Sequence, residues 1–344
     1  MRIDTEAHFY PPGYASYLRG RARPPRAEAT EHGLRCWDEP SLPDFMHVRG
    51  TRLGNALGEV GAERIAAMDA AGIDVQVLSI STPGCEQFEP DQGSAVARQA
   101  NDELAALIAA HPDRFVGLAA LAPVPEHPEW AADELRRCVR ELGFRGAKIN
   151  SHIRELFLDD ERFGVLLAAA AELSVPIYLH PAVPHAAMAL PYLDYGFELA
   201  GPSLGFGAET ALHAMRMIHG GVFDRHPSLQ IVLGHMGEAL PFWLYRLDLA
   251  VTRPRAFPGP GPRLSRRPSD YLRANFYFTT SGNFRYSAML PALLEFGTDR
   301  MMFASDYPYE DMRQAADFVD GVPLSGPDRD RLNWATASAL FAIS

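Results

Sequence analysis

One pattern of apolar and polar positions repeats along the whole chain. A short apolar run rich in β-forming residues is followed by a polar or glycine-containing break, and then by ten or more residues with helical spacing. The apolar runs predict eight strands: Arg2–His8, Val75–Ser79, Phe115–Leu121, Gly146–Asn150, Pro176–His180, Gln230–His235, Phe276–Ser281 and Met301–Asp306. The segments between them predict helices, among them Ala62–Ala71, Gly93–Ala110, Trp130–Leu142, Asp160–Leu173, Gly207–Gly220, Glu238–Val251 and Tyr286–Phe296.

This alternation favours one fold class. Nearly continuous apolar strands that alternate with amphipathic helices are typical of a parallel sheet buried on both faces, and eight strands close a TIM-type barrel. We therefore predict an α/β fold, a (β/α)8 barrel formed by a single domain over residues 1–344. An open doubly wound sheet is the alternative. It is disfavoured because no Gly-x-Gly-x-x-Gly segment follows the first strand and no Walker loop occurs.

Two stretches depart from the repeat. Residues from about 10 to 60 are rich in Pro, Gly and Arg and carry Trp37 and Phe45, and residues 181–206 combine prolines with an apolar series. Connections of this length in a compact domain are usually functional or disordered. Their aromatic content favours ordered cap loops over the C-terminal mouth of the barrel.

Composition limits the kinds of molecule that this protein is expected to bind. Of 344 residues, 47% are hydrophobic, and the net charge is −11, which argues against a nucleic-acid surface. The basic cluster from Arg253 to Arg267 is interrupted by prolines and is predicted to be a loop. No apolar run reaches 18 residues and the N-terminus is polar, so we expect a cytoplasmic protein without a membrane partner. Cys36, Cys85 and Cys138 are expected to be free thiols.

The candidate chemistry lies at the ends of the predicted strands. Barrel enzymes carry their catalytic groups at the C-terminal ends of the strands, and here those ends hold Glu6, His8, His180, His235 and Asp306. Alternation places Glu6 and His8 on one face of the first strand, roughly 6.6–7 Å apart. A lone histidine at a strand end is more often simply hydrogen-bonded. A set of two imidazoles and two carboxylates instead favours a divalent metal such as Zn²⁺ or Mn²⁺.

Several motifs carry a resemblance to a known family, and they cover nearly the whole chain in family order. They are Glu6-Ala7-His8-Phe9, Gly143–Gly146 leading to Ile149–His152, Tyr178–Pro181, Gly234–Glu238 with Trp243–Asp248, and Ala304–Pro308. The chain resembles the amidohydrolase-type, metal-dependent decarboxylases of aromatic acids. That family includes 5-carboxyvanillate, γ-resorcylate and 2,3-dihydroxybenzoate decarboxylases. The middle of the chain looks most like the first of these, whereas the Glu-x-His of the first strand follows the γ-resorcylate pattern.

The resemblance implies one divalent metal ion, Mn²⁺ or Zn²⁺, held by Glu6, His8, His180 and Asp306. It also implies catalytic roles for Asp306, as the acid that protonates the ring carbon, and for His235, oriented by Glu238. The alternative for Glu238 is a favourable charge in the first turn of a helix. Lys148 is expected to be structural or to support the ligands, so a mononuclear site is favoured over one bridged by a carbamylated lysine.

The resemblance further implies residues that bind an anionic substrate. Arg246 is expected to reach the site of a neighbouring subunit, which predicts a homodimer or homotetramer; otherwise it solvates an outer helix. Arg49 corresponds to a carboxylate-binding arginine, with Arg52 as the alternative. Tyr309 is expected to contact the substrate, or else to pack under the barrel rim.

Together these features predict the non-oxidative decarboxylation of a small hydroxylated benzoic acid. In this hypothesis the substrate carboxylate and ortho-hydroxyl bind the metal, and His235 helps to stabilise charge on the phenolic oxygen. A hydrolase or hydratase of the same barrel superfamily is the first alternative, and it would use a metal-activated water. A non-enzymatic binding protein is the second, and it is disfavoured by the proposed ligand set.

Overall fold

The computed structural model describes residues 1–252 and 264–344. Most of the loop predicted between Arg253 and Arg267 therefore lies outside the described residues. Within the described part of the chain, no helix combines the length and apolar character needed to cross a bilayer. The three cysteines are buried and free, as predicted.

Parallel strands occupy the positions of the predicted apolar runs. They are β1 (Ile3–Phe9), β5 (Val75–Ile80), β6 (Phe115–Gly117), β7 (Ala119–Ala120), β8 (Ala147–Asn150), β9 (Ile177–His180), β10 (Ile231–Leu233), β11 (Phe276–Thr279) and β12 (Met301–Met302). Their orders are β1-β5-β6 and β7-β8-β9-β10-β11-β12. The run predicted as one strand, Phe115–Leu121, is divided at Leu118, because its first half pairs with β5 and its second half with β8.

Backbone hydrogen bonds join these two sets of strands into a ring. Between β6 and β7, the N–H of Leu118 donates to the carbonyl of Leu78 in β5 (2.9 Å). At the other junction, the segment that follows β12 lies beside β1. There the N–H of His8 donates to the carbonyl of Tyr307 (2.7 Å), and a parallel bridge joins Tyr307 to Ala7. The fold is the predicted (β/α)8 barrel.

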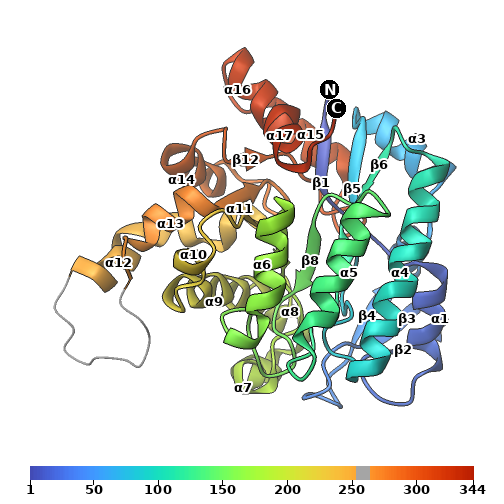
Figure 1. The fold of residues 1–344 in the computed structure, drawn as a ribbon. Helices are drawn as coiled ribbons and strands as arrows, with labels where there is room; N and C mark the ends of the chain where they lie inside the picture. The colour runs from blue at the N-terminus through green and yellow to red at the C-terminus, as the bar shows by residue number, and fades with distance from the viewer. Residues whose placement is uncertain (253–263) are drawn as a thin grey trace.

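Helices surround the strands (Figure 1). They are α3 (Ala62–Ala71), α4 (Pro90–Ala110), α5 (Pro128–Arg140), α6 (Gly164–Leu173), α9 (Gly205–His219), α10 (Val222–Arg225), α12 (Leu240–Thr252), α13 (Pro268–Asn275), α14 (Tyr286–Phe296) and α15 (Met312–Asp320), followed by α16 (Gly326–Asp330), the π-turn η3 (Arg331–Ala335) and α17 (Thr336–Phe341). Five of the seven predicted helix starts differ by two to four residues: the helices predicted from Gly93, Trp130 and Gly207 begin earlier, at Pro90, Pro128 and Gly205, and two begin later. The helix predicted from Asp160 begins at Gly164 after a 3-10 turn, η1 (Glu161–Phe163), and the helix predicted from Glu238 begins at Leu240.

An apolar layer fills the base of the barrel. Ile3, Val77, Val232 and Met302 pack there against Phe341 of α17. A bulge in β1 separates this layer from the polar layer above it. Asp4 pairs with Gln76 but Ala7 pairs with Leu78, so β1 advances three residues while β5 advances two. The extra residue lets Ile3 face the apolar base while Glu6 and His8 face the interior near the C-terminal mouth.

The two stretches expected to form cap loops contain ordered elements. Residues 10–60 hold α1 (Pro12–Gly20), the antiparallel sheet β2 (Arg26–Thr30), β3 (Gly33–Trp37) and β4 (His47–Gly50), and then α2 (Thr51–Gly58). Residues 181–206 hold α7 (Ala186–Ala189), η2 (Leu190–Tyr195) and α8 (Gly196–Ala200). The ring of His47 stacks on Phe197 at 4.1 Å, which joins the two stretches. Figure 1 places α7 and β2–β4 at the end of the molecule opposite the two termini.

Candidate metal centre and active site

The four predicted metal ligands lie together at the mouth of the barrel. One potential ligand atom from each of Glu6, His8, His180 and Asp306 lies within 4.8 Å of every other. Glu6 and His8 come from β1, His180 ends β9, and Asp306 follows β12. Parallel strands in a barrel deliver their C-terminal ends to one rim, and this is why residues up to 300 positions apart in the chain meet here.

The potential ligand atoms of these four residues converge, and one of them, Glu6 Oε1, has no hydrogen-bond partner within the described ranges. His8 Nε2 lies 2.9 Å from Asp306 Oδ1 and 3.9 Å from Glu6 Oε1, and His180 Nε2 lies 3.3 Å from the same Glu6 oxygen. Glu6 Oε1 is buried and accepts no hydrogen bond with good geometry from any residue in the described ranges. A buried carboxylate oxygen without a donor costs free energy unless a cation faces it. The mixed nitrogen and oxygen set therefore fits a divalent metal ion.

The electrostatics of His8, His180 and Glu6 suit ligation, whereas Asp306 is shifted toward its protonated form. Burial lowers the pKa of His180 to about 4. Burial and the charge of Lys148 together lower the pKa of His8 well below its usual value. Both imidazoles therefore keep a lone pair at neutral pH. Burial favours the protonated acid at Glu6, but contact with the neighbouring histidines outweighs it and holds the pKa of Glu6 well below the usual range. Burial, assisted by the charge of Glu6, raises the pKa of Asp306 to about 7.

His235 and Glu238 form the predicted hydrogen-bonded pair, at 2.6 Å between Nδ1 and Oε1. The alternative, a charge in the first turn of the long helix, was wrong, because these residues form a separate turn, α11 (His235–Glu238), before α12. All residues from His235 to Ala239 have φ between 52° and 77°, so the turn is left-handed. Such a conformation costs roughly 1–2 kcal/mol for each residue other than glycine, and such strain clusters at functional sites.

The left-handed turn aims His235 at the predicted ligands. Its Nε2 lies 3.7 Å from Asp306 Oδ2 and 4.0 Å from Glu6 Oε1. Burial disfavours the imidazolium, but the charge of Glu238 more than compensates and raises the pKa of His235 well above its usual value. Glu238 fits because Gly207 of α9 has no side chain; a Cβ there would lie 2.8 Å from Glu238 Oε2.

The predicted substrate-binding residues Arg49 and Tyr309 lie at the rim, in different settings. Arg49 is buried, and its Nη2 donates to Asp38 (2.7 Å) and to the hydroxyl of Thr82 (2.9 Å). Its Nε and Nη1 are buried and have no hydrogen-bond partner among residues 1–252 and 264–344. The ring centroid of Tyr309 lies 5.6 Å from that of His8.

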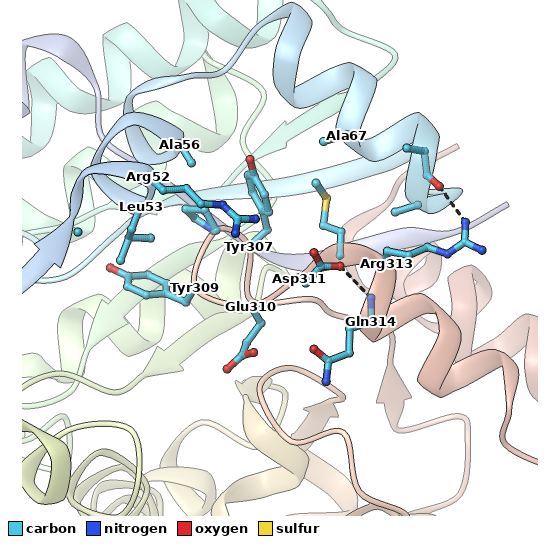
Figure 2. Close-up of a pocket in the computed structure, with 15 residues that line it drawn as sticks. Arg52, Leu53, Ala56, Ala67, Tyr307, Tyr309, Glu310, Asp311, Arg313 and Gln314 are labelled. Carbon is cyan, nitrogen blue, oxygen red and sulfur yellow. Dashed lines mark hydrogen bonds between the residues drawn. The ribbon is translucent and has the colours of Figure 1, made fainter. Parts of the chain in front are cut away.

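Arg52 occupies a different place from Arg49. It is exposed and lines a groove of about 790 Å³ between α2, α3 and the segment before α15. Figure 2 shows Arg52, Tyr307, Tyr309 and Glu310 around this groove. Tyr309 lines this groove and also lies beside His8. Arg52 lines the same groove but is exposed to solvent.

Arg246 lies on the exposed side of α12. Its neighbours on that helix, Phe242 (76% exposed), Trp243 (43%) and Tyr245 (78%), are unusually exposed for aromatic residues. On α14, which contacts α12, Leu290 and Leu294 are also exposed. Phe242 and Trp243 lie one helical turn before Arg246 on α12, so exposed aromatic side chains flank this arginine.

The structure gives a position to Lys148, which was expected to be structural or to support the ligands, and adds Asn150, to which the sequence assigned no role. Lys148 points into the barrel, where its Nζ lies 3.1 Å from His8 Nδ1 and donates to the carbonyl of Ile80 (2.8 Å). Asn150 donates through Nδ2 to Glu86, which leaves its Oδ1 buried and unpaired within the described part of the chain. The neighbouring apolar residues of β8, Ala147 and Ile149, pack in the outer core. Alternation along β8 then turns Lys148 and Asn150 to the interior, although the local sequence alone does not show which face of the strand is the inner one.

The chain belongs to the amidohydrolase family, whose model matches residues 3–343. The γ-resorcylate decarboxylase of Rhodococcus jostii (strain RHA1) is 41% identical over 293 residues, which are 81% of this chain and 87% of that protein. A dihydroxybenzoic acid decarboxylase of Polaromonas sp. JS666, solved with manganese and the inhibitor 2-nitroresorcinol, has a TM-score of 0.83 and 35% identity, covering 99% of this chain and 96% of that one.

The structure of 5-carboxyvanillate decarboxylase from Sphingomonas paucimobilis is similar over the whole fold. It has a TM-score of 0.87 and 34% identity, and it covers 100% of this chain and 99% of that one. These relatives confirm the family resemblance that the motifs indicated.

Proposed function

We propose that this protein is a carboxy-lyase that removes the carboxylate of a small hydroxylated aromatic acid without an oxidant. The observation that carries the proposal is the buried centre of Glu6, His8, His180 and Asp306 with an unpaired carboxylate oxygen, in a barrel similar throughout its length to aromatic-acid decarboxylases. Manganese in the Polaromonas relative supports a single divalent ion, Mn²⁺ or Zn²⁺, as the cofactor. When bound, such an ion stabilises negative charge on substrate oxygens as a Lewis acid.

Asp306 serves as the proton donor in this proposal. Its Oδ1 faces His8, whereas its Oδ2 faces His235 and is available to the substrate. Burial and the charge of Glu6 raise the pKa of this carboxyl group before a metal binds, which favours its protonated form. The proton adds to the ring carbon that bears the carboxylate; the C–C bond then breaks, its electron pair restores the aromatic ring, and CO₂ leaves. Solvent returns a proton to Asp306.

His235 and Glu238 support the same step electrostatically. Glu238 fixes Nδ1 of His235 and favours the imidazolium, whose Nε2–H then points toward the reacting region. A cationic donor in this position stabilises charge that develops on the phenolic oxygen.

Arg49 and Tyr309 are proposed to bind the substituents of the ring. The free Nε–H and Nη1–H of Arg49 are buried charged donors, each of which suits a carboxylate or phenolate oxygen. Asn150 adds an unpaired acceptor, Oδ1, which suits a ring hydroxyl. Tyr309 is held by a hydrogen bond with Ser81 (2.6 Å) beside His8 and contributes a ring face.

Arg246 is proposed to act on the substrate of a neighbouring subunit in a homodimer or homotetramer. It follows His235 by eleven positions, beyond the left-handed turn, and lies on the exposed side of α12. The exposed aromatic surface around Arg246 supports pairing of two copies about a two-fold axis, where each subunit gives its arginine to the other.

Deuterium labelling tests the reaction. The enzyme loaded with Mn²⁺ is incubated in D₂O with a panel of hydroxybenzoates, and the product is analysed by NMR. We expect CO₂ release and one deuterium at the carbon that lost the carboxylate, with turnover lowered at least about 100-fold in Asp306→Asn. Product without deuterium at that carbon, or product with a hydroxyl gained from water, would show a different reaction, the latter a hydrolase or hydratase.

A further inference from the structure

The two carboxylate oxygens of Glu6 have opposite surroundings. Oε1 faces His8, His180 and His235 and accepts no hydrogen bond within the described ranges. Oε2 accepts hydrogen bonds from the hydroxyl groups of Tyr178, on β9, and Thr279, on β11 (3.2 Å from Thr279). The side chain of Glu6 is 1% exposed, so water does not compensate for this difference.

Hydrogen counting fixes the direction of the network around Oε2. The backbone N–H of His235 donates to the hydroxyl oxygen of Ser281 (3.1 Å). An ionised carboxylate only accepts, so the single hydroxyl hydrogens of Tyr178 and Thr279 both donate to Glu6 Oε2. Thr279 then has no hydrogen left for Ser281, and the Ser281 hydroxyl donates to Thr279 across 2.9 Å. The network therefore begins in the left-handed turn at His235 and ends on one oxygen of Glu6.

The backbone is arranged to admit this carboxylate. Gly234 lies directly against it, since a Cβ at this position would be 3.3 Å from both Glu6 oxygens. Tyr178 also precedes His180 by two residues on β9, so both side chains face the barrel interior from one rigid strand. Strand β9 thus carries one proposed ligand, His180, and the group that orients another.

We propose that Tyr178 and Thr279 are positioning residues for the metal centre. Their two hydroxyl groups occupy Oε2 and so leave Oε1 of Glu6 as the ligand atom, and they stabilise Glu6 as an anion. The proposal rests on the proposed function, because it assumes that Glu6 binds the metal. In this proposal the two hydroxyl groups strengthen metal binding, and the turn at His235 helps to hold Glu6 in the geometry that binds the metal.

The test measures metal affinity separately from activity. Apoenzyme is titrated with Mn²⁺ in competition with a chelator, for wild type, Tyr178→Phe, Thr279→Val and Thr279→Ser. Because Phe and Val keep the shape but lose the hydroxyl, we expect the dissociation constant to rise about 10–100-fold for each, the usual effect of removing such support. Thr279→Ser retains the hydroxyl and should stay within a few-fold of wild type.

Tyr277→Phe is the matched control. Tyr277 lies on β11 two residues before Thr279 and packs with the apolar base of the barrel, so loss of its hydroxyl should leave the Mn²⁺ affinity unchanged. Thermal unfolding of each apoenzyme establishes that the variants are folded.

The outcomes separate the two proposals. If folded Tyr178→Phe and Thr279→Val bind Mn²⁺ as tightly as wild type does, the positioning role is wrong and the proposed function is unaffected. Weaker binding by Tyr277→Phe to the same degree would also overturn the positioning role, because the effect would not be specific to the hydroxyl network. If wild type itself binds neither Mn²⁺ nor Zn²⁺, the proposed function fails.

Discussion

His152 provides a quantitative test of the buried charges that join the cap to the barrel. It follows β8 and lies between two carboxylates: its Nε2 is 2.9 Å from Glu39 of the cap, and its Nδ1 is 2.7 Å from Glu209 of α9. All three side chains are at most 3% exposed. Two other histidines lie near it: the ring of His185 is at 5.7 Å, and burial together with the charge of His152 lowers the pKa of His213.

The two carboxylates decide the charge of this imidazole. Burial lowers the pKa of His152, but Glu209 and Glu39 outweigh burial and raise it from 6.5 to about 9. A difference of this size corresponds to about 3 kcal/mol of folding free energy. Because the pKa is higher in the folded protein than in the unfolded chain, this stabilisation is complete below about pH 6.5 and is lost as the pH rises through about 9.

His152→Gln removes the charge and keeps a side chain of similar reach. For 344 residues, 3 kcal/mol corresponds to a difference in Tm of about 4 °C. We expect the gap in Tm between wild type and His152→Gln to be about 4 °C larger at pH 6 than at pH 9.5, measured by calorimetry. The comparison of two proteins at each pH removes contributions from all other titrating groups that the substitution does not affect.

His127→Gln is the matched control. This histidine stacks on Trp130 at the surface, with its side chain 50% exposed, so its gap in Tm should be the same at both pH values. A gap for His152→Gln that does not change between pH 6 and pH 9.5 would refute the reasoning, because it would mean that folding does not raise the pKa of His152.

Two further predictions concern the catalytic centre. His180→Ala should lose most bound metal and activity and keep its fold, because the barrel core does not depend on this side chain; metal analysis that finds full occupancy would exclude His180 as a primary ligand. Arg246→Ala and Asp306→Ala should each be nearly inactive alone. A mixture in which subunits exchange freely should regain about a quarter of wild-type activity. Half of the randomly formed pairs are hybrids, and each hybrid has one intact site of two. If native mass spectrometry detects hybrids and no activity returns, Arg246 does not act across the interface.

The sequence alone determined the class of fold and the composition of the centre. Alternation in β1 placed Glu6 and His8 on one face, and both do face the barrel interior. His180 and Asp306 could be grouped with them because parallel strands end at a common rim, so a residue's place at a strand end predicts its neighbours before any distance is known. The family motifs gave the reaction class for the same reason: they preserve the identity and order of these strand-end residues.

The tertiary structure decided features that depend on long-range contacts. The local pattern did not show which way Lys148 points, and packing buries it beside His8. Nor did the pattern distinguish Arg49 from Arg52. In the structure Arg49 is buried with unpaired donors, whereas Arg52 lines the groove at the surface. The left-handed turn at His235 also has no local signal beyond one glycine, because residues with a side chain adopt that conformation only where surrounding contacts compensate for the strain.

The two oxygens of Glu6 are distinguished in the same way. They are chemically equivalent in the sequence and become different only when hydroxyl groups from β9 and β11 close around one of them. Periodicity along the chain reports which face a residue takes, because strand geometry is local. The partner of an individual atom is set by strands that meet only when the barrel closes, and so the structure alone determines it.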